Sequence, residues 1–408
     1  MKIVMPASMS RVEYDEPNCA SCHLIKNSKL MLYGEGKKRI LILLEKQDPI
    51  QQTSKTYAIG DRFTWIKETL ASFGIDISLD CWVTSTVACF GNTIMATQAQ
   101  CCFPYLKDTI KKLKPELVIA FGDMSAKVLF SRVVEKDASC QAVHGLLHNS
   151  REFGCNIMST FTPHSNVKGN RPDSIDDLLI KRDIKIALES LKTPRRIWKE
   201  ETDCVKILSD TDAVKCMEYM IQNPKRRMSA FDYETNCLRP YNKNSKLWSV
   251  SICEHPDMSY AFMLNENTIP QFRKWLQTQH ILKIAHNSHF ERLWSIVKLG
   301  INPALLNIDT MLLAHALDNR DMGGLSIKFL APIFIGTTVW NANVEAELKP
   351  SDKDMKQYGT YAINTIHRIP KRILLTYNAI DSLVEYRTAI VLLDQLKHFY
   401  ETFPEIEE

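Results

Sequence analysis

The sequence predicts an α/β protein built from two domains. Over the first half of the 408-residue chain, apolar runs typical of buried strands alternate with helical patterns, as in a domain with a largely parallel sheet. A charged, proline-containing segment at 193–203 interrupts this alternation. Strand-like runs in succession then precede a mainly helical remainder, which indicates a mixed sheet covered by helices. We therefore expect one domain over residues 1–192, a linker over 193–204 and a second domain over 205–408.

The elements of the first domain follow from this alternation. Its strand-like runs are "RILILLE" (39–45), "CWVTSTVAC" (81–89), "ELVIAFG" (116–122) and "CNIMSTF" (155–161). Helical patterns occupy residues 62–74, 101–115 and 124–134. The amphipathic pattern over 174–192 predicts the helix that closes the domain, with Asp173 or Ser174 as its N-cap.

The second domain opens with "CVKILSD" (204–210) and a helical pattern over 211–224. Strand-like runs follow at 228–235, 246–255 and 258–264. The last element, residues 374–400, has apolar side chains at helical spacing over several turns. A strand-rich beginning therefore precedes one long closing helix.

Charge and hydropathy restrict the class of protein. The formal charge of +4 is mildly basic, and it neither requires nor excludes a nucleic acid partner. The basic clusters "TPRRIWK", "NPKRRM" and "HRIPKR" are either nucleic acid contacts or solvated loop charge. Apolar runs fall well short of the ~20 residues of a membrane-spanning helix, and the N-terminus becomes polar too early for a signal peptide. We expect a cytoplasmic protein with no membrane partner.

Acidic residues form the first candidate site. Asp232 and Glu234, in "SAFDYETNC", alternate along a strand and so share a face, as would a pair that binds two separate basic side chains. "KIAHNSHFERLW" (283–294) adds Glu291, and "YNAID" places Tyr377 and Asp381 four residues apart on one helix face. Three separate segments thus each offer an acid to one site.

These segments resemble the proofreading 3′ to 5′ exonuclease domain of family A DNA polymerases, over about residues 205–400. That domain has a ribonuclease-H-like fold of the DEDD type, with a tyrosine in its third motif. The three motifs correspond to Asp232 and Glu234, to Asn287, Phe290 and Glu291, and to Tyr377 and Asp381. Glutamate stands at position 291 where the family has aspartate. Its extra methylene shifts the carboxylate by about a bond length, which matters in a site that tolerates about 0.5 Å unless the backbone adjusts.

The resemblance implies two Mg²⁺ or Mn²⁺ ions. Such ions, roughly 3.5 to 4 Å apart, clamp an anionic phosphodiester, and hard cations prefer the oxygen ligands that carboxylates supply. By resemblance Asp232 bridges both ions, and Glu234 and Asp381 complete the ion that activates water. Tyr377 would orient that water, Glu291 would hold the other ion directly or through water, and Asn287 would contact the nucleic acid.

Cysteines form the second candidate site. Twelve cysteines without an export signal are not expected to form a disulfide framework. Cys19 and Cys22 form a C-x-x-C pair, and Cys89 and Cys102 complete a set of four that is either a metal site or core thiols. With "CCFPYL" and "KPELVIAFGDMSAKVLF", these residues resemble the iron-sulfur uracil-DNA glycosylase superfamily over about residues 15–170, whose three-layer α/β domain binds a 4Fe-4S cluster. Zinc is the alternative metal. The neighbouring Cys101 leaves the fourth ligand ambiguous, and the spacing to "PYL" favours Cys102.

The residues that would perform glycosylase chemistry differ from the family pattern. The stretch "LLEKQDPIQQ" contains no glycine where the family has its water-activating motif, and Ser85 replaces the asparagine that reads uracil. The late motif reads "TFTPHS", with Thr162 before Pro163 and His164 after it. We expect either a DNA-binding remnant, with His164 at the nucleic acid, or a purely structural α/β module.

The combined prediction is a metal-dependent 3′ to 5′ exonuclease that acts on single-stranded or frayed 3′ ends of DNA. The architecture resembles the front portion of viral family A replicative polymerases, so proofreading or end processing in phage replication, in the host cytoplasm, is the expected role. The sequence ends at "FPEIEE" without a polymerase motif, which suggests a standalone proofreading subunit or a polymerase on a separate chain. The alternatives are an RNA-trimming exonuclease and a non-catalytic DNA-binding scaffold for a polymerase.

Overall fold

The computed structural model describes residues 19–24, 32–131, 138–163, 175–224, 228–318, 325–337, 340–341 and 343–402. The chain divides into two compact units, and the changeover lies between Arg196 and Ile197, with Pro332–Gly336 assigned to the N-terminal unit. The helices of the described ranges fall short of the length and apolarity that a membrane crossing requires.

The described part of the N-terminal unit contains a five-stranded sheet in the order β2-β1-β3-β5-β4. Its strands are β1 (Ile40–Leu44), β2 (Cys81–Ser85), β3 (Leu117–Phe121), β4 (Leu147–Ser150) and β5 (Cys155–Thr160). All pairs are parallel except β4 with β5, which form an antiparallel edge. Every residue of β1, β3 and β5 is buried, as expected for strands that are covered on both faces.

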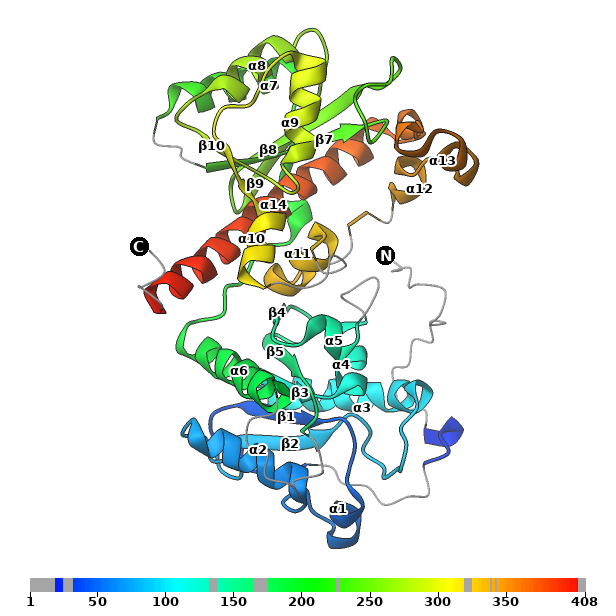
Figure 1. Ribbon diagram of the computed structural model, residues 1–408, viewed down its shortest axis with the longest axis vertical. Helices are drawn as coiled ribbons and strands as arrows, with labels where there is room; N and C mark the ends of the chain where they lie inside the picture. Colours follow the sequence, from blue (N-terminus) through cyan, green and yellow to red (C-terminus); the bar gives the residue numbers. More distant parts are fainter. Residues whose placement is uncertain are drawn as a thin grey trace. The chain divides into compact units, whose positions relative to one another are not determined.

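Helices cover both faces of this sheet (Figure 1). They are α1 (Pro49–Ser54), α2 (Asp61–Ser72), α3 (Ala96–Leu113), α4 (Asp123–Phe130), α5 (Cys140–Val143) and α6 (Ile175–Glu189), with the short 3-10 turns η1 (Cys19–Ser21) and η2 (Ser190–Lys192). Alternate β1 residues such as Ile40 and Ile42 pack with Phe63 of α2 and Ile184 of α6 in one core. The result is a three-layer α/β unit, and the predicted α/β class is confirmed.

The C-terminal unit is built on a six-stranded mixed sheet in the order β11-β10-β7-β8-β9-β6. Its strands are β6 (Val205–Ile207), β7 (Met228–Thr235), β8 (Leu247–His255), β9 (Met258–Met263), β10 (Leu282–Ala285) and β11 (Leu306–Asp309). Strands β7, β8 and β9 form an antiparallel meander, whereas β10 and β11 are added in parallel beside β7. Strand β7 therefore lies at the junction of the parallel and antiparallel parts.

The helices of this unit lie on both sides of the sheet (Figure 1). They are α7 (Asp210–Gln222), α8 (Ile269–Gln277), α9 (His289–Trp294), α10 (Thr310–Leu317), α11 (Ile327–Ile335), α12 (Glu345–Leu348), α13 (Asp352–Tyr358) and α14 (Lys371–Thr402), with the short turns η3 (Glu201–Cys204), η4 (Ser295–Leu299), η6 (Gly359–Tyr361) and η7 (Ile366–Arg368).

The residues of β7 alternate between two cores. Phe231 and Tyr233 pack with α7 and α8, whereas Ala230 packs with Leu383 and Tyr386 of α14. Because side chains alternate along a strand, Asp232 and Glu234 share the α14 side with Ala230. The pattern of the strand therefore directs both acids toward the long closing helix.

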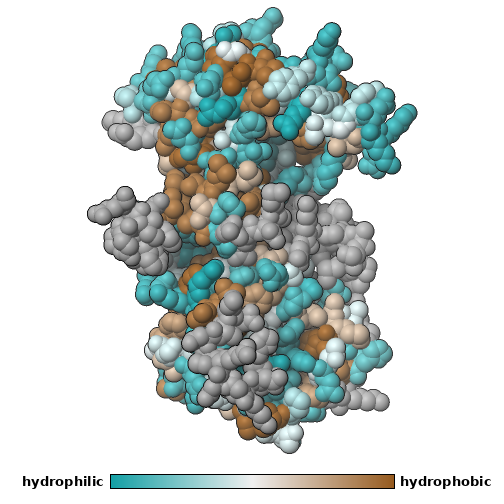
Figure 2. Space-filling view, viewed as in Figure 1, coloured by the Kyte–Doolittle hydropathy of each residue, from teal (hydrophilic) through white to brown (hydrophobic). Residues whose placement is uncertain are grey.

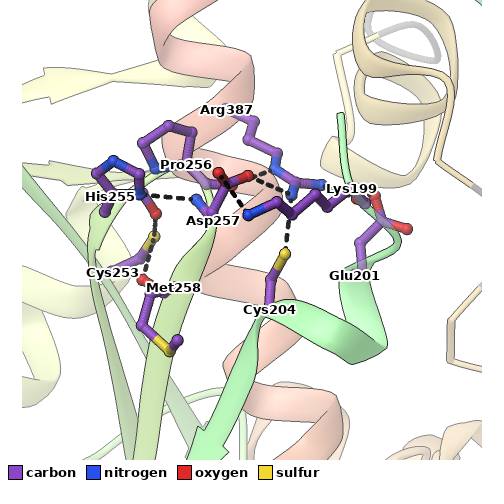
Figure 3. Close-up of polar contacts among 9 residues, drawn as sticks. All are labelled: Lys199, Glu201, Cys204, Cys253, His255, Pro256, Asp257, Met258 and Arg387. Carbon is purple, nitrogen blue, oxygen red and sulfur yellow. Dashed lines mark hydrogen bonds and ion pairs between the residues drawn. The ribbon is translucent and has the colours of Figure 1, made fainter. Parts of the chain in front are cut away.

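A buried arginine joins the start of this unit to α14 (Figure 3). Arg387 has no exposed surface, and its guanidinium donates to the carbonyls of Pro256 at 2.7 Å and Lys199 at 3.0 Å. It also donates to Glu201 Oε1 at 3.0 Å and to Cys204 Sγ at 3.3 Å. A planar donor fork suits several acceptors at once. The second half of the segment predicted as a linker, which includes η3, is thus bound to α14.

Lys283 on β10 is a second buried cation. Its ammonium donates to the carbonyls of Thr278, Ile281 and Ala304 at 3.0, 3.1 and 2.9 Å, and burial lowers its pKa to about 8. We expect Lys283→Met to lower the free energy of unfolding by about 3 kcal/mol, because the three carbonyls lose their donor. Urea denaturation measures this loss, with Lys274→Met on exposed α8 surface as control. A loss no larger than in the control would contradict it.

Candidate active site

Three carboxylates meet where β7 faces α14. Asp232 and Glu234 come from alternate positions of β7, and Asp381 comes from α14. One oxygen of each lies within 4.8 Å of the others. Glu234 and Asp381 are buried and Asp232 is partly exposed, so the group opens toward solvent at Asp232. The structure therefore brings together the first and third predicted acidic motifs.

Neighbouring side chains fix the orientation of these acids. Asn378 Nδ2 donates to Asp232 Oδ2 at 2.9 Å and to the Asp232 carbonyl at 3.2 Å. Ser249 Oγ donates to Asn378 Oδ1 at 2.9 Å, which fixes the amide in turn. Trp340 Nε1 donates to Asp381 Oδ1 at 2.7 Å, and the Tyr377 side chain is hydrogen-bonded to the same carboxylate. Both acids are thus held before any ligand binds.

Glu291, on α9, lies outside the group of three carboxylates whose oxygens are within 4.8 Å of one another. It is buried, and the charged group that acts on it most strongly is Asp232. Asp309, the N-cap of α10, accepts from the backbone amides of Asn287 at 3.0 Å and Ser288 at 2.7 Å. Asn287 is exposed and has φ of +62°, a conformation that asparagine tolerates better than most residues. Asp309 therefore fixes the turn before α9, the helix that carries Glu291.

Burial and mutual repulsion destabilise the negative charges of the site. Burial is the main cause that raises the pKa of Asp232, and the charge of Asp381 is the second. Burial also raises the pKa values of Glu234 and Glu291, with the charge of Asp232 as the second cause. Burial raises the pKa of Asp381 to about 6, although the hydrogen bond from Trp340 lowers it. Lys328 opposes the rise at Asp232, Glu234 and Asp381. Bound cations would relieve this repulsion.

The residues of the site fit divalent cations with hard oxygen preference. Mg²⁺ and Mn²⁺ take carboxylate oxygens, and Asp232, Glu234 and Asp381 offer three oxygens within reach of one ion. Glu291 Oε2 has no hydrogen-bond partner within the described part of the chain, although it is buried. A buried carboxylate oxygen without a donor calls for a ligand.

Several residues of the site were not predicted from the sequence. Asn378 and Asp309 position Asp232 and the turn before α9, and Trp340 binds Asp381. Asn378 stands beside Tyr377 within the quoted "YNAID", and Asp309 within "NIDTMLLAHAL", so their place near motif residues was a usable signal. No sequence pattern distinguishes Trp340.

The four predicted cysteines of the N-terminal unit lie in one neighbourhood. Cys22, Cys89 and Cys102 share a small apolar cluster with Val87, and the thiols of Cys89, Cys19 and Cys22 all act on Cys102. Burial raises the pKa of Cys102 to about 11. Strand β2 ends at Ser85, so Cys89 lies beyond the strand predicted to contain it.

At the position that the resemblance gives to the uracil pocket, polar side chains bond one another. Ser85, in the place of the uracil-reading asparagine, is buried, and its hydroxyl bonds the Tyr57 hydroxyl and the Val87 carbonyl, each at 2.7 Å. A cavity of about 450 Å³ nearby is lined by Lys46, Arg62, Phe90 and neighbouring residues. His164 lies outside the described residues.

Comparison with known proteins assigns the two units. Residues 205–397 match the 3′-5′ exonuclease family. A DNA polymerase of Bacillus phage SP01 is 25% identical over 393 residues, which is 87% of this chain and 40% of that protein. A type-4 uracil-DNA glycosylase of Pyrobaculum aerophilum is 26% identical over 152 residues, 36% of this chain and 77% of that protein.

Among solved structures, Brucella melitensis NrnC aligns with a TM-score of 0.34 and 17% identity over 48% of this chain and 82% of that one. Trypanosoma brucei RNase D, in complex with GMP, aligns with a TM-score of 0.35 and 14% identity over 47% and 57% of the two chains.

Residues 205–397 of the C-terminal unit thus form a domain of the 3′-5′ exonuclease family. The chain joins this domain to an N-terminal domain that is similar to uracil-DNA glycosylase, and its similarity to the phage DNA polymerase extends over 393 residues. The predicted resemblance and fold class are thereby confirmed. The chain spans 40% of the length of that polymerase.

Proposed function

We propose that the C-terminal domain hydrolyses DNA phosphodiester bonds from a 3′ end with two divalent metal ions as cofactors. The observation that carries this proposal is the meeting of Asp232, Glu234 and Asp381, with oxygens within 4.8 Å of one another, in a domain of the 3′-5′ exonuclease family. The phage polymerase relative supports DNA as the substrate, and proofreading or end processing in phage replication as the role. A DNA polymerase on a separate chain is the partner that this role implies.

The side chains of the site have separate tasks in this reaction. Two Mg²⁺ or Mn²⁺ ions held there would activate water and stabilise the leaving oxygen. Asp232, Glu234, Glu291 and Asp381 would supply oxygen ligands, with Asp232 held by Asn378. Tyr377 keeps its proton, since burial and then Asp381 raise its pKa well above the ordinary value. Its hydroxyl therefore acts as a donor that orients Asp381 or the attacking water, and not as a base.

Exposed side chains beside the site support a single-stranded substrate. After β7 the chain passes through Leu238 and Tyr241, which are 53% and 59% exposed. Asn242 Nδ2 bonds the carbonyl of Tyr361, itself 46% exposed, at 3.2 Å and so joins the two segments. Around them, the surface over α12 and α13 is mainly hydrophilic (Figure 2). Aromatic rings of this kind stack on bases regardless of sequence.

A nuclease assay tests this function. The full chain is mixed with 3′-labelled single-stranded DNA, a duplex with a mismatched 3′ end, or RNA, each with Mg²⁺ or Mn²⁺. We expect release of labelled nucleotide from DNA, reduced by about a hundredfold or more in Asp232→Ala, because one ligand to both ions is lost. Faster digestion of RNA would instead identify an RNA-trimming enzyme. No digestion with either metal would contradict the nuclease proposal and favour a binding scaffold.

We also propose that Cys19, Cys22, Cys89 and Cys102 of the N-terminal domain hold a 4Fe-4S cluster. Soft thiolates are suitable ligands for iron-sulfur clusters and for zinc. The other three thiols act on Cys102, which supports Cys102 over Cys101 as the fourth ligand. The likeness to a type-4 uracil-DNA glycosylase is consistent with such a cluster. Its task would be to fix the loops that carry these cysteines.

Metal analysis of cysteine variants tests the cluster. Anaerobically purified protein is expected to carry about four iron atoms per chain and broad absorption at about 400 nm. Cys22→Ser and Cys102→Ser should lose both signals, whereas the adjacent Cys101→Ser should keep them. Bound zinc without this absorption would show that the cysteines hold zinc in place of an iron-sulfur cluster. Wild-type protein that contains no metal would contradict the proposal.

We further propose that the N-terminal domain contacts DNA without removing bases. The Ser85 hydroxyl is occupied by Tyr57 and Val87, so it offers little to a uracil edge, which needs paired donors and acceptors. The cavity of about 450 Å³ is lined by Lys46 and Phe90 and by the ion pair of Arg62 with Asp48, and Lys46 and Phe90 suit contact with a nucleic acid strand.

A further inference from the structure

Glu385 is a buried acid on α14 that lies outside the three exonuclease motifs. It follows Asp381 by four residues, about one helical turn, and so shares a helix face with Tyr377 and Asp381. Its side chain is 3% exposed, and its Oε2 has no hydrogen-bond partner among the residues that the structure describes. Because a buried polar atom without a partner is costly, this oxygen indicates a ligand that the protein itself does not supply.

Glu291 has the same two properties. It is 2% exposed and its Oε2 also lacks a partner in the described ranges. The charged groups that act most strongly on Glu385 are all acidic, and they are Asp232, Glu291, Asp381 and Asp309. Asp232 is the first of them, as it is for Glu291. Asp232 is therefore linked to two groups of acids. Glu234 and Asp381 have oxygens within 4.8 Å of it and of one another, whereas Glu291 and Glu385 lie outside that distance as a group and are linked to it by charge.

The charges of the two groups match two divalent cations. The five carboxylates carry five negative charges at most, and Lys328 is a cation that acts on Asp232, Glu234 and Asp381. Two divalent ions together with Lys328 supply five positive charges. A buried set of acids this large is stable only when it is paired or bound to metal.

We propose that Glu385 is a further metal ligand of this site and binds the second divalent cation together with Glu291 and Asp232. The proposal rests on the two-metal exonuclease function put forward above. It also accounts for the glutamate at position 291, because a second carboxylate from α14 would complete a cation site that the longer side chain has displaced. The first cation remains with Asp232, Glu234 and Asp381.

Binding of Mn²⁺ to the full chain tests this assignment independently of activity. Calorimetry and the electron paramagnetic resonance of bound Mn²⁺ are expected to show two ions that depend on Asp232, with binding to Asp232→Ala as the background. Glu385→Gln, which keeps the side-chain shape, should lower the affinity for one of these ions by about tenfold or more and leave the affinity for the other unchanged. Glu291→Gln should lower the affinity for the same ion. The double variant, with both glutamates replaced, should lower this affinity by less than the product of the two single effects.

Controls separate this assignment from loss of structure. Asp394→Asn changes an exposed acid further along α14 and should leave both ions unchanged. If Glu385→Gln does not fold, judged by circular dichroism in EDTA, Glu385→Asp takes its place and should weaken the same ion. Wild-type affinity for both ions in the folded Glu385 variant, or a single Asp232-dependent ion in the wild type, would overturn the assignment. Two ions without digestion of DNA or RNA would refute the nuclease function and leave Glu385 as a cation ligand.

Discussion

Replacing Asp381 with asparagine is expected to lower the rate constant for DNA digestion at saturating substrate by about a thousandfold, or roughly 4 kcal/mol. Asparagine keeps the acceptor for Trp340 Nε1 but removes a negative charge within 4.8 Å of the Asp232 and Glu234 oxygens. The cation that activates water would then be bound by two carboxylates in place of three. Single-turnover kinetics with 3′-labelled DNA measures the effect.

The control for this variant is Asp394→Asn, which changes an exposed acid on the same helix and should keep the wild-type rate. In EDTA, Asp381→Asn should melt at a higher temperature than the wild type, because a destabilised buried charge has been removed. A variant that retains more than a tenth of the wild-type rate would contradict the role assigned to Asp381.

Replacing Arg387 with methionine is expected to lower the free energy of unfolding of the exonuclease domain by about 3 to 5 kcal/mol. The guanidinium is the donor to the Pro256 and Lys199 carbonyls and the partner of buried Glu201. Methionine fills a similar volume but removes the guanidinium from this buried carboxylate. Urea unfolding followed by tryptophan fluorescence measures the loss.

Two further variants define the origin of this loss. Arg372→Met, at an exposed position of the same helix, should unfold as the wild type does. Adding Glu201→Gln to Arg387→Met should recover part of the lost stability, since the carboxylate that lost its guanidinium partner is then neutral. A double variant that is less stable than Arg387→Met alone would show that the loss does not act through Glu201.

The fold was predictable where one kind of pattern dominates a segment. Strands β1 and β3 are apolar throughout, and β5 is buried throughout, because helices cover both faces of their sheet, and such runs are visible in the sequence. Strand β4, "LHNS", is mostly polar and pairs only at the edge, so periodicity did not identify it. Helix α3 begins at Ala96, five residues before the predicted start, and continues through Pro104.

The active site was predictable to the extent that its residues form local motifs. Alternation along β7 places Asp232 and Glu234 on one face, and helical spacing does the same for Tyr377 and Asp381. Trp340 and Lys328 reach the site only through tertiary packing, which no spacing rule encodes. Glu385 continues the four-residue spacing of α14, and its burial, which the structure shows, is what separates it from an ordinary surface acid.

The position of Arg387 has a practical consequence for anyone who wishes to express the nuclease half alone. A shortened polypeptide that starts at residue 205, where the family match begins, would omit Lys199, Glu201 and Cys204, and with them most acceptors of the guanidinium. Trp198, whose ring lies 5.2 Å from the Arg387 side chain, would be lost as well. The shortened polypeptide should therefore begin at Ile197 or earlier, because a later start leaves a buried guanidinium that has lost most of its acceptors.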